Sequence, residues 1–120
     1  MAYTIAASKE LTTVQFQSTP TLEELRDAIE KSDGFSSPLE LWNLLASELP
    51  FTSDQMEGLA ELANAKQHHP QKTAIVAAGD LAYGLLRLYV AYRHQSGIEA
   101  LVFRNERAAR RWLFEQDSAP

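Results

Sequence analysis

The stretch that most constrains the fold of this chain runs from Lys72 to Gly97, because it has the pattern of a strand, a tight turn and a long helix. Thr73 to Ala78 is an unbroken run of small or β-branched residues without a charge. A strand that is covered on both faces has this composition, since helices shield both sides of a parallel sheet. Gly79 interrupts the run, and Asp80 is predicted to be the N-cap of the helix that follows.

The helix that begins at Leu81 carries two lines of residues at helical spacing. The line predicted to face the core consists of Leu81, Leu85, Leu88 and Tyr92. The second line, with spacing i, i+4, i+7 and i+11, consists of Tyr83, Arg87, Val90 and His94. Because tyrosine and arginine are enriched at protein interfaces, this second line is a candidate contact surface for another chain, most simply a second copy that forms a homodimer. The alternative is that both sides of the helix are buried within one chain.

Strand and helix patterns alternate along the rest of the chain. Strands are predicted at residues 3–7, 11–17, 39–45 and 99–103, and the first two form a hairpin. Capping boxes that begin at Thr21 and Thr52 predict the starts of two helices, and Asn105 is predicted to cap a last one. The order β-β-α-β-α-β-α-β-α predicts an α/β fold with a mixed sheet of about five strands and about four helices, in which parallel βα units follow the N-terminal hairpin.

Length and composition narrow the class of protein. The 120 residues suit a single domain with one core, in which 39–45 and 73–78 are the central strands and 116–120 is a loose polar tail. The chain contains no cysteine, which excludes disulfides and thiolate chemistry. A net charge of −5 argues against generic nucleic-acid binding, which draws on neutralisation of phosphates. No signal-peptide pattern and no apolar run of roughly 18 residues is seen, so neither secretion nor a membrane span is expected, and the expected location is the cytoplasm.

Several motifs in the C-terminal half resemble a known family. The segment AIVAAGDLAYGLLRLYVAY is followed by VFRNERAARRWL. Together they are similar to the SpoIIAA-like branch of the STAS (anti-anti-sigma-factor antagonist) superfamily, which often carries a D-L-A-x-G-L-x-R helix, a VFR strand and an A-x-x-W-L helix. The matching residues here are Asp80, Leu81, Ala82, Gly84, Leu85, Arg87, Val102, Phe103, Arg104, Ala109, Trp112 and Leu113. The order of elements also agrees over nearly the whole chain.

The resemblance implies a mixed α/β fold and a non-catalytic role in binding a partner kinase. In that family the kinase phosphorylates a serine of a D-S-S-G motif at the start of the helix after the central strand. The comparable segment here runs from Phe51 to Asp54, so Thr52 and Ser53 are the candidate phosphate acceptors. The helix dipole and the free N–H groups of a first turn favour a phosphate at such a place. The alternative role of Thr52 is that of an ordinary N-cap.

A second candidate site follows from the geometry of the sheet. Small molecules bind at the carboxyl ends of the strands in open α/β sheets. The residues expected at this edge are Ser47, Glu48, Thr52, Gly79, Asp80 and Arg104. A competing function is the binding of a small apolar ligand or lipid in a pocket between the sheet and the helices. Trp42 and Tyr89 could line such a pocket, although the filling of an ordinary core also explains them.

Patterns of catalysis and of metal binding are not found in the sequence. His68 and His69 are adjacent, and no cysteine or nearby carboxylate pair completes a metal site with them. Neighbouring carboxylates such as Glu23 and Glu24 are expected on the outward faces of helices. Because no set of acid, base and nucleophile is visible, no cofactor or metal is expected. An uncharacterised enzyme is therefore ranked behind the interaction module and the ligand carrier.

Overall fold

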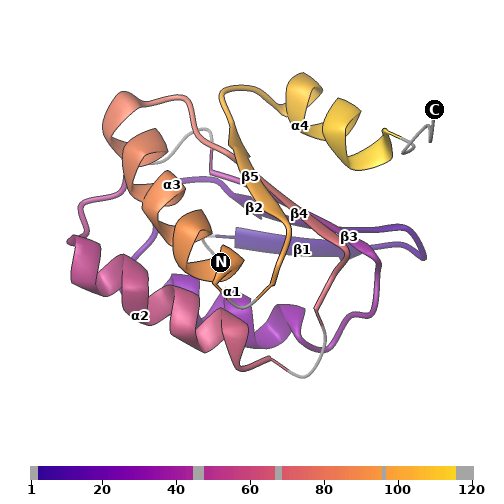
Figure 1. Cartoon of the computed structure of the whole chain (residues 1–120), viewed down its shortest axis with the longest axis horizontal. Coiled ribbons are helices and arrows are strands. Elements are labelled where there is room, and N and C mark those ends of the chain that lie inside the picture. Colours follow the sequence, from indigo (N-terminus) through magenta and orange to yellow (C-terminus); the bar gives the residue numbers. More distant parts are fainter. Residues whose placement is uncertain (1–2, 45–47, 67–68, 96, 116–120) are drawn as a thin grey trace.

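A computed structural model describes residues 3–44, 48–66, 69–95 and 97–115 of the chain, and Figure 1 shows how its strands and helices alternate. The strands are β1 (Tyr3–Ala7), β2 (Leu11–Phe16), β3 (Leu39–Asn43), β4 (Lys72–Val76) and β5 (Ala100–Phe103). The helices are α1 (Leu22–Ser32), α2 (Ser53–Asn64), α3 (Asp80–His94) and α4 (Glu106–Phe114).

The strands lie side by side in the order in which they occur in the chain, from β1 to β5. β1 and β2 form the predicted antiparallel hairpin, and all later neighbours are parallel. The register places Glu40 of β3 between Thr12 of β2 and Thr73 of β4. The predicted α/β fold with a mixed five-stranded sheet is therefore confirmed, with β3 and β4 in the interior of the sheet.

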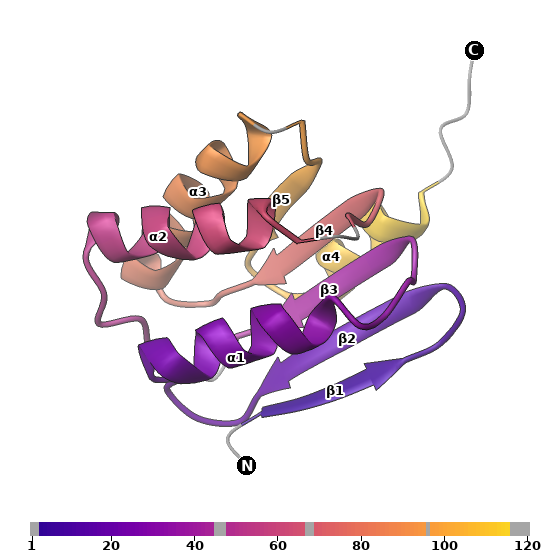
Figure 2. The ribbon, with the colours of Figure 1, turned by 90° about the horizontal axis from the view of Figure 1, so that it is seen from below.

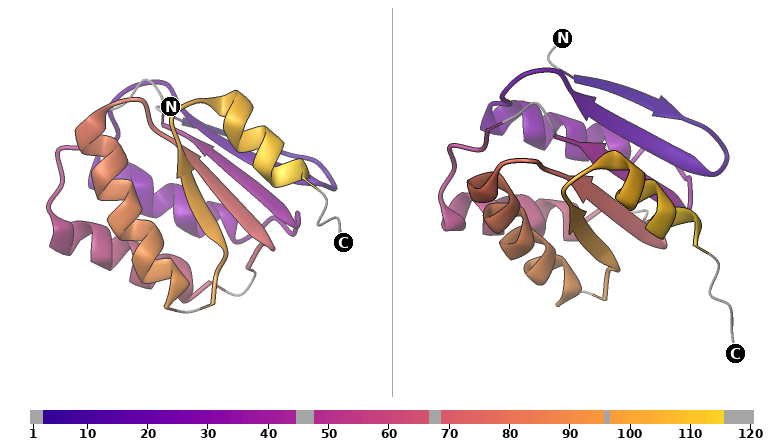
Figure 3. Two further views of the ribbon diagram at one scale, coloured as in Figure 1. Left: turned by 45° about the horizontal axis from the view of Figure 1, so that its top comes forward. Right: turned by 90° about the horizontal axis from the view of Figure 1, so that it is seen from above.

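The helices cover the two faces of the sheet unequally. α1, α2 and α3 lie on one face and α4 lies on the other, as Figures 2 and 3 show. Because the parallel strands follow one another across the sheet in chain order, crossovers of the same hand bring each connecting helix to the same side. α4 follows the last strand and packs back across β5, β4 and β3. No helix in the described part of the chain is long and apolar enough to cross a membrane.

Each face of the sheet has its own apolar cluster. The larger cluster lies between the sheet and α1, α2 and α3, and it includes Trp42 and Leu86. The smaller cluster lies under α4 and includes Leu41, Val76 and Leu113. Successive side chains of a strand point to opposite faces, so β3 and β4 contribute to both clusters. This double burial explains why these two strands are the most continuous apolar runs of the chain.

The rotation of α3 about its axis differs from the predicted one. Leu81 is 73% exposed, so the line predicted to face the core is wrong at its first residue. The buried residues of the helix are Ala82, Leu86, Val90 and Arg93. Apolar residues occur on nearly every side of α3, which packs against both α2 and β5. The periodicity alone therefore does not determine which side faces the sheet.

The starts of the helices test the predicted caps. Thr21, Thr52 and Asn105 each accept a backbone N–H with the side chain at the start of their helix, as predicted. At α3 the prediction is wrong, because Gly79 is the N-cap and makes no side-chain cap bond. Asp80 is the first helical residue, and its carboxylate binds an arginine that follows β5.

Candidate functional site

Arg104 holds together the edge of the sheet where the parallel strands end. Its Nη1 donates to Asp80 Oδ1 at 2.7 Å and to the carbonyl oxygen of Ala78 at 3.0 Å. Its guanidinium also lies 4.0 Å from the centroid of the Tyr83 ring. Since the Asp80 side chain is 96% exposed, this ion pair adds little to the free energy of unfolding. Its main effect is to fix the positions of the two side chains.

A hollow of about 320 Å³ opens beside Asp80. The loop from Glu48 to Pro50 forms one wall, and residues 79–82 form the other. The structure therefore brings three of the predicted edge residues to one place, namely Glu48, Asp80 and the Arg104 that binds Asp80. The fourth, Ser47, lies outside the described residues.

The predicted phosphate acceptors lie at the start of α2, on the same edge of the sheet. Thr52 Oγ1 accepts the N–H of Gln55 at 3.2 Å, and Gln55 Oε1 accepts the N–H of Thr52 at 2.9 Å. This capping box uses the hydroxyl of Thr52 and leaves that of Ser53 outside it. Both side chains are exposed. Of the two hydroxyls, that of Ser53 is therefore the more accessible to a modifying enzyme.

The line of Tyr83, Arg87, Val90 and His94 faces the sheet edge of its own chain. Val90 is 6% exposed and belongs to the larger apolar cluster, so its prediction as a contact residue for another chain is wrong. The cause is the rotation of α3, which turns this position toward β5. Tyr83, Arg87 and His94 border a shallow groove of about 420 Å³ between α3 and β5. His94 Nε2 lies 2.8 Å from the carbonyl oxygen of Ala100, the first residue of that edge strand.

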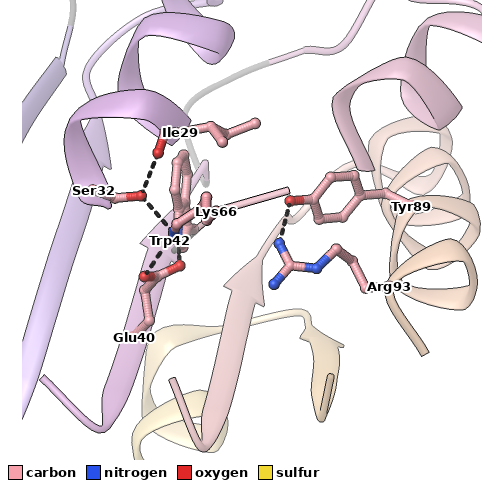
Figure 4. A network of polar contacts seen from close by, with 7 residues as sticks. All are labelled: Ile29, Ser32, Glu40, Trp42, Lys66, Tyr89 and Arg93. Carbon is pink, nitrogen blue, oxygen red and sulfur yellow. Dashed lines mark hydrogen bonds and ion pairs between the residues drawn. The ribbon is translucent and has the colours of Figure 1, made fainter. Parts of the chain in front are cut away.

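A buried polar layer lies under the helices, near the amino ends of the strands, and Figure 4 shows its members. Lys66 Nζ lies 3.6 Å from Glu40 Oε2 and donates to Ser32 Oγ at 2.8 Å. Ser32 Oγ donates in turn to the carbonyl oxygen of Ile29 at 2.8 Å. The indole Nε1 of Trp42 donates to Glu40 Oε1 at 2.5 Å. Each charge in this half of the layer therefore has a partner.

The other half of the layer contains Arg93, which is 2% exposed. Its Nη1 donates to the Tyr89 hydroxyl at 3.2 Å, while Nε and Nη2 find no hydrogen-bond partner among the described residues. The Oγ1 atoms of Thr12 and Thr73 are buried without such a partner as well. Burial raises the pKa of Tyr89, an effect that the nearby Arg93 charge partly offsets and the Glu40 charge reinforces. The Tyr89 hydroxyl therefore keeps its proton.

A small cavity of about 30 Å³ lies between the sheet and α1, α2 and α3. Trp42 and Tyr89 line it, as the sequence suggested for a ligand pocket, and Thr73 lines it too. The other lining residues are apolar side chains from the three helices, the loop before α2 and the interior strands. A volume of this size holds about one water molecule. The cavity is thus in the predicted place, and a lipid would enter it only if the helices moved apart.

The described residues hold no group of His, Asp and Glu side chains arranged to bind a metal ion. His69 is exposed, and His68 lies outside the described residues. Comparisons with protein-family models, with curated proteins and with solved structures find no match for this chain.

Proposed function

We propose that this protein is a non-catalytic, STAS-like interaction module. A partner protein docks on the surface formed by Glu48, Thr52, Ser53, Asp80 and Leu81, which we name the docking edge. The observation that carries the proposal is the exposure of Leu81, which is 73% accessible in the first turn of α3 and lines the hollow beside two carboxylates. An apolar side chain framed by polar groups is typical of a protein contact surface.

The arrangement of the elements supports the same proposal. α2 begins directly after the loop that follows the interior strand β3, which is the position that the family resemblance implies for the phosphorylated helix. Thr52 and Ser53 are exposed there. A phosphate on either residue would carry a charge of about −1.5 to −2 and would hold water tightly. Phosphorylation is therefore expected to weaken the binding of any partner that must bury this edge.

The docking edge is tested by removing its apolar side chain. Wild-type protein, Leu81→Asp and Leu101→Asp are used to recover partners from the cells in which the protein occurs, and binding of a purified partner is then measured by calorimetry. Leu101 lies on β5 and is 40% exposed, so it is a matched control. Leu81→Asp is expected to bind at least about tenfold more weakly, since burial of a leucine contributes roughly 1.5–3 kcal/mol. A partner that binds Leu81→Asp as tightly as wild type would contradict the proposal.

The phosphate acceptors are tested separately with a partner kinase recovered in this way. Wild type, Thr52→Ala, Ser53→Ala and the double variant are incubated with the kinase and labelled ATP. Labelling is expected to fall most in Ser53→Ala, because the Thr52 hydroxyl is engaged in the capping box. Undiminished labelling of the double variant would exclude both residues as the only acceptors.

A second candidate function is the binding of a small apolar ligand between the sheet and the helices. The observation that favours it is the cavity lined by Trp42, Thr73 and Tyr89, next to the incompletely paired guanidinium of Arg93. The chemistry of this polar end determines which ligand would fit.

A further inference from the structure

The buried polar layer carries an excess of positive charge. Glu40, Lys66 and Arg93 are the ionisable side chains that are buried in the described part of the chain. Two of them are cations and one is an anion, so the sum is +1. Glu40 is already bound by Lys66 and by Trp42. A buried charge without a partner is strongly unfavourable, and the layer therefore lacks one negative charge to balance Arg93.

The donors that Arg93 leaves unused have a specific geometry. Nε and Nη2 form one edge of the planar guanidinium, on which two N–H groups point in the same direction. This edge is the fork that binds a carboxylate through two parallel hydrogen bonds. The remaining nitrogen, Nη1, is occupied by the Tyr89 hydroxyl, as Figure 4 shows. The free part of Arg93 is thus shaped for an acceptor with two oxygens in one plane.

Tyr89 connects this fork to the apolar cavity. Its hydroxyl accepts from Arg93, and its side chain lines the cavity together with Thr73. Because Tyr89 remains protonated, its hydroxyl can also donate to an oxygen that Arg93 binds. The space beyond is apolar, with Leu59, Ile75 and Leu86 among its lining residues. Polar donors at one end and hydrocarbon at the other match a molecule with an acidic head and an apolar body.

We propose that Arg93 and Tyr89 bind the carboxylate of a small apolar monocarboxylic acid, whose hydrocarbon part fills the cavity between the sheet and α1, α2 and α3. One negative charge balances the layer, whereas a phosphate dianion would exceed the excess charge and would have no use for an apolar cavity. Since the cavity measures about 30 Å³, the acid enters as the helices move outward from the sheet. This proposal deepens the second candidate function and is independent of the docking edge.

The test uses butanoate, octanoate and dodecanoate as probes, with octanol and inorganic phosphate as controls. Binding to the full chain is measured by calorimetry, and the Nε–H resonance of Arg93 is followed by NMR. Saturable binding of at least one acid, with a shift of this resonance, is the expected result. Binding of octanol as tight as that of octanoate would overturn the proposal, and so would the absence of saturable binding of all three acids.

Variants separate the fork from the cavity. Arg93→Lys keeps the charge but not the fork, and it is expected to weaken binding of the acid by about tenfold or more, as the loss of one hydrogen bond to a charged group implies. Tyr89→Phe removes the second donor and is expected to weaken binding by a smaller factor. Unchanged affinity in both variants would overturn the proposal. Leu81→Asp should bind the acid like wild type, so the docking edge and the acid site can fail independently.

Discussion

Lys66 and Arg93 are both buried cations, but their surroundings differ. Lys66 has a carboxylate at 3.6 Å and a hydroxyl at 2.8 Å, whereas the one hydrogen bond of the Arg93 guanidinium among the described residues goes to Tyr89. Removal of one member of a buried pair leaves the other as an unpaired charge, while removal of an unpaired charge relieves a cost. Substitution of these two residues by the same apolar side chain should therefore have different effects.

Lys66→Met is expected to lower the free energy of unfolding by about 3–5 kcal/mol, because Glu40 then keeps its charge without its cation. Arg93→Met, as the matched variant, is expected to leave the free energy of unfolding unchanged or to raise it by about 1 kcal/mol. Unfolding in urea measures both values. Equal losses in the two variants would show that Arg93 has a partner as effective as Glu40.

This layer could not be predicted from the sequence at the level of single residues. Glu40 stands out as a charge within an apolar run, but Lys66 follows α2 and Arg93 lies in the last turn of α3. Their proximity depends on how the two helices lie on the sheet. Arg93 also belongs to the buried side of α3, which the spacing of apolar residues did not identify.

At the scale of elements, local signals predicted more than distant ones did. The capping boxes at Thr21 and Thr52 involve residues three positions apart, and both occur as predicted. The role of Asp80 was missed because its partner Arg104 lies 24 positions further along the chain. The rotation of α3 was missed because neighbours on two sides make most of its residues apolar.

Gly84 illustrates the same limit and yields a stability prediction. Close packing against a strand would explain a glycine within a helix, but Gly84 is exposed and a Cβ built there would meet nothing within 4 Å. Gly84→Ala is therefore expected to raise the free energy of unfolding by about 1 kcal/mol. Thermal unfolding followed by circular dichroism measures the change. Gly97→Ala is the control, since Gly97 has a φ of 79° and alanine should destabilise the protein there.

α4 is attached to the sheet through Glu106. Its carboxylate accepts from Arg110 Nε at 2.8 Å and from Asn43 Nδ2 of β3 at 2.9 Å. The hydrogen bond from Arg110, helped by its charge and by Asn43, lowers the pKa of Glu106. A lowered folded pKa contributes stability that is complete above the unfolded pKa of about 4.3. This contribution is lost as the pH falls through the folded value.

Glu106→Gln is accordingly expected to destabilise the protein at neutral pH and to make its stability depend less on pH in the acid range. The difference between wild type and variant should shrink as the pH falls from about 5 to about 2. Urea unfolding at a series of pH values measures this difference. A constant difference across the series would contradict the assigned role of the carboxylate.

At the scale of the whole molecule, the sequence predicted how strands and helices alternate, and this determined much of the candidate site. Crossovers between successive parallel strands place all their carboxyl ends at one edge, which is why Glu48, Asp80 and Arg104 meet. The contact line on α3 was predicted less well, since Val90 is covered by its own chain. Tyr83, Arg87 and His94 remain available along the groove beside β5, and a homodimer through this edge stays a prediction.

Sedimentation velocity tests that prediction with two variants. Tyr83→Glu is expected to convert dimers into monomers while the folded structure is kept, because the ring is half-buried at the border of the groove. Val90→Glu is expected to unfold the protein instead, since it buries an unpaired charge in the core. Wild-type protein that sediments as a monomer at high concentration would contradict the homodimer.

The order of the strands has a consequence for synthesis on the ribosome. Each strand pairs with the next one to emerge, so the sheet can grow step by step from its N-terminal hairpin. α4 is the exception, because it returns to β3 and β4, which emerge much earlier. Until α4 arrives, Leu41, Ala74 and Val76 form an uncovered apolar surface on the nascent chain. A chaperone that protects this chain would therefore be needed longest at this surface, and release would follow the docking of α4.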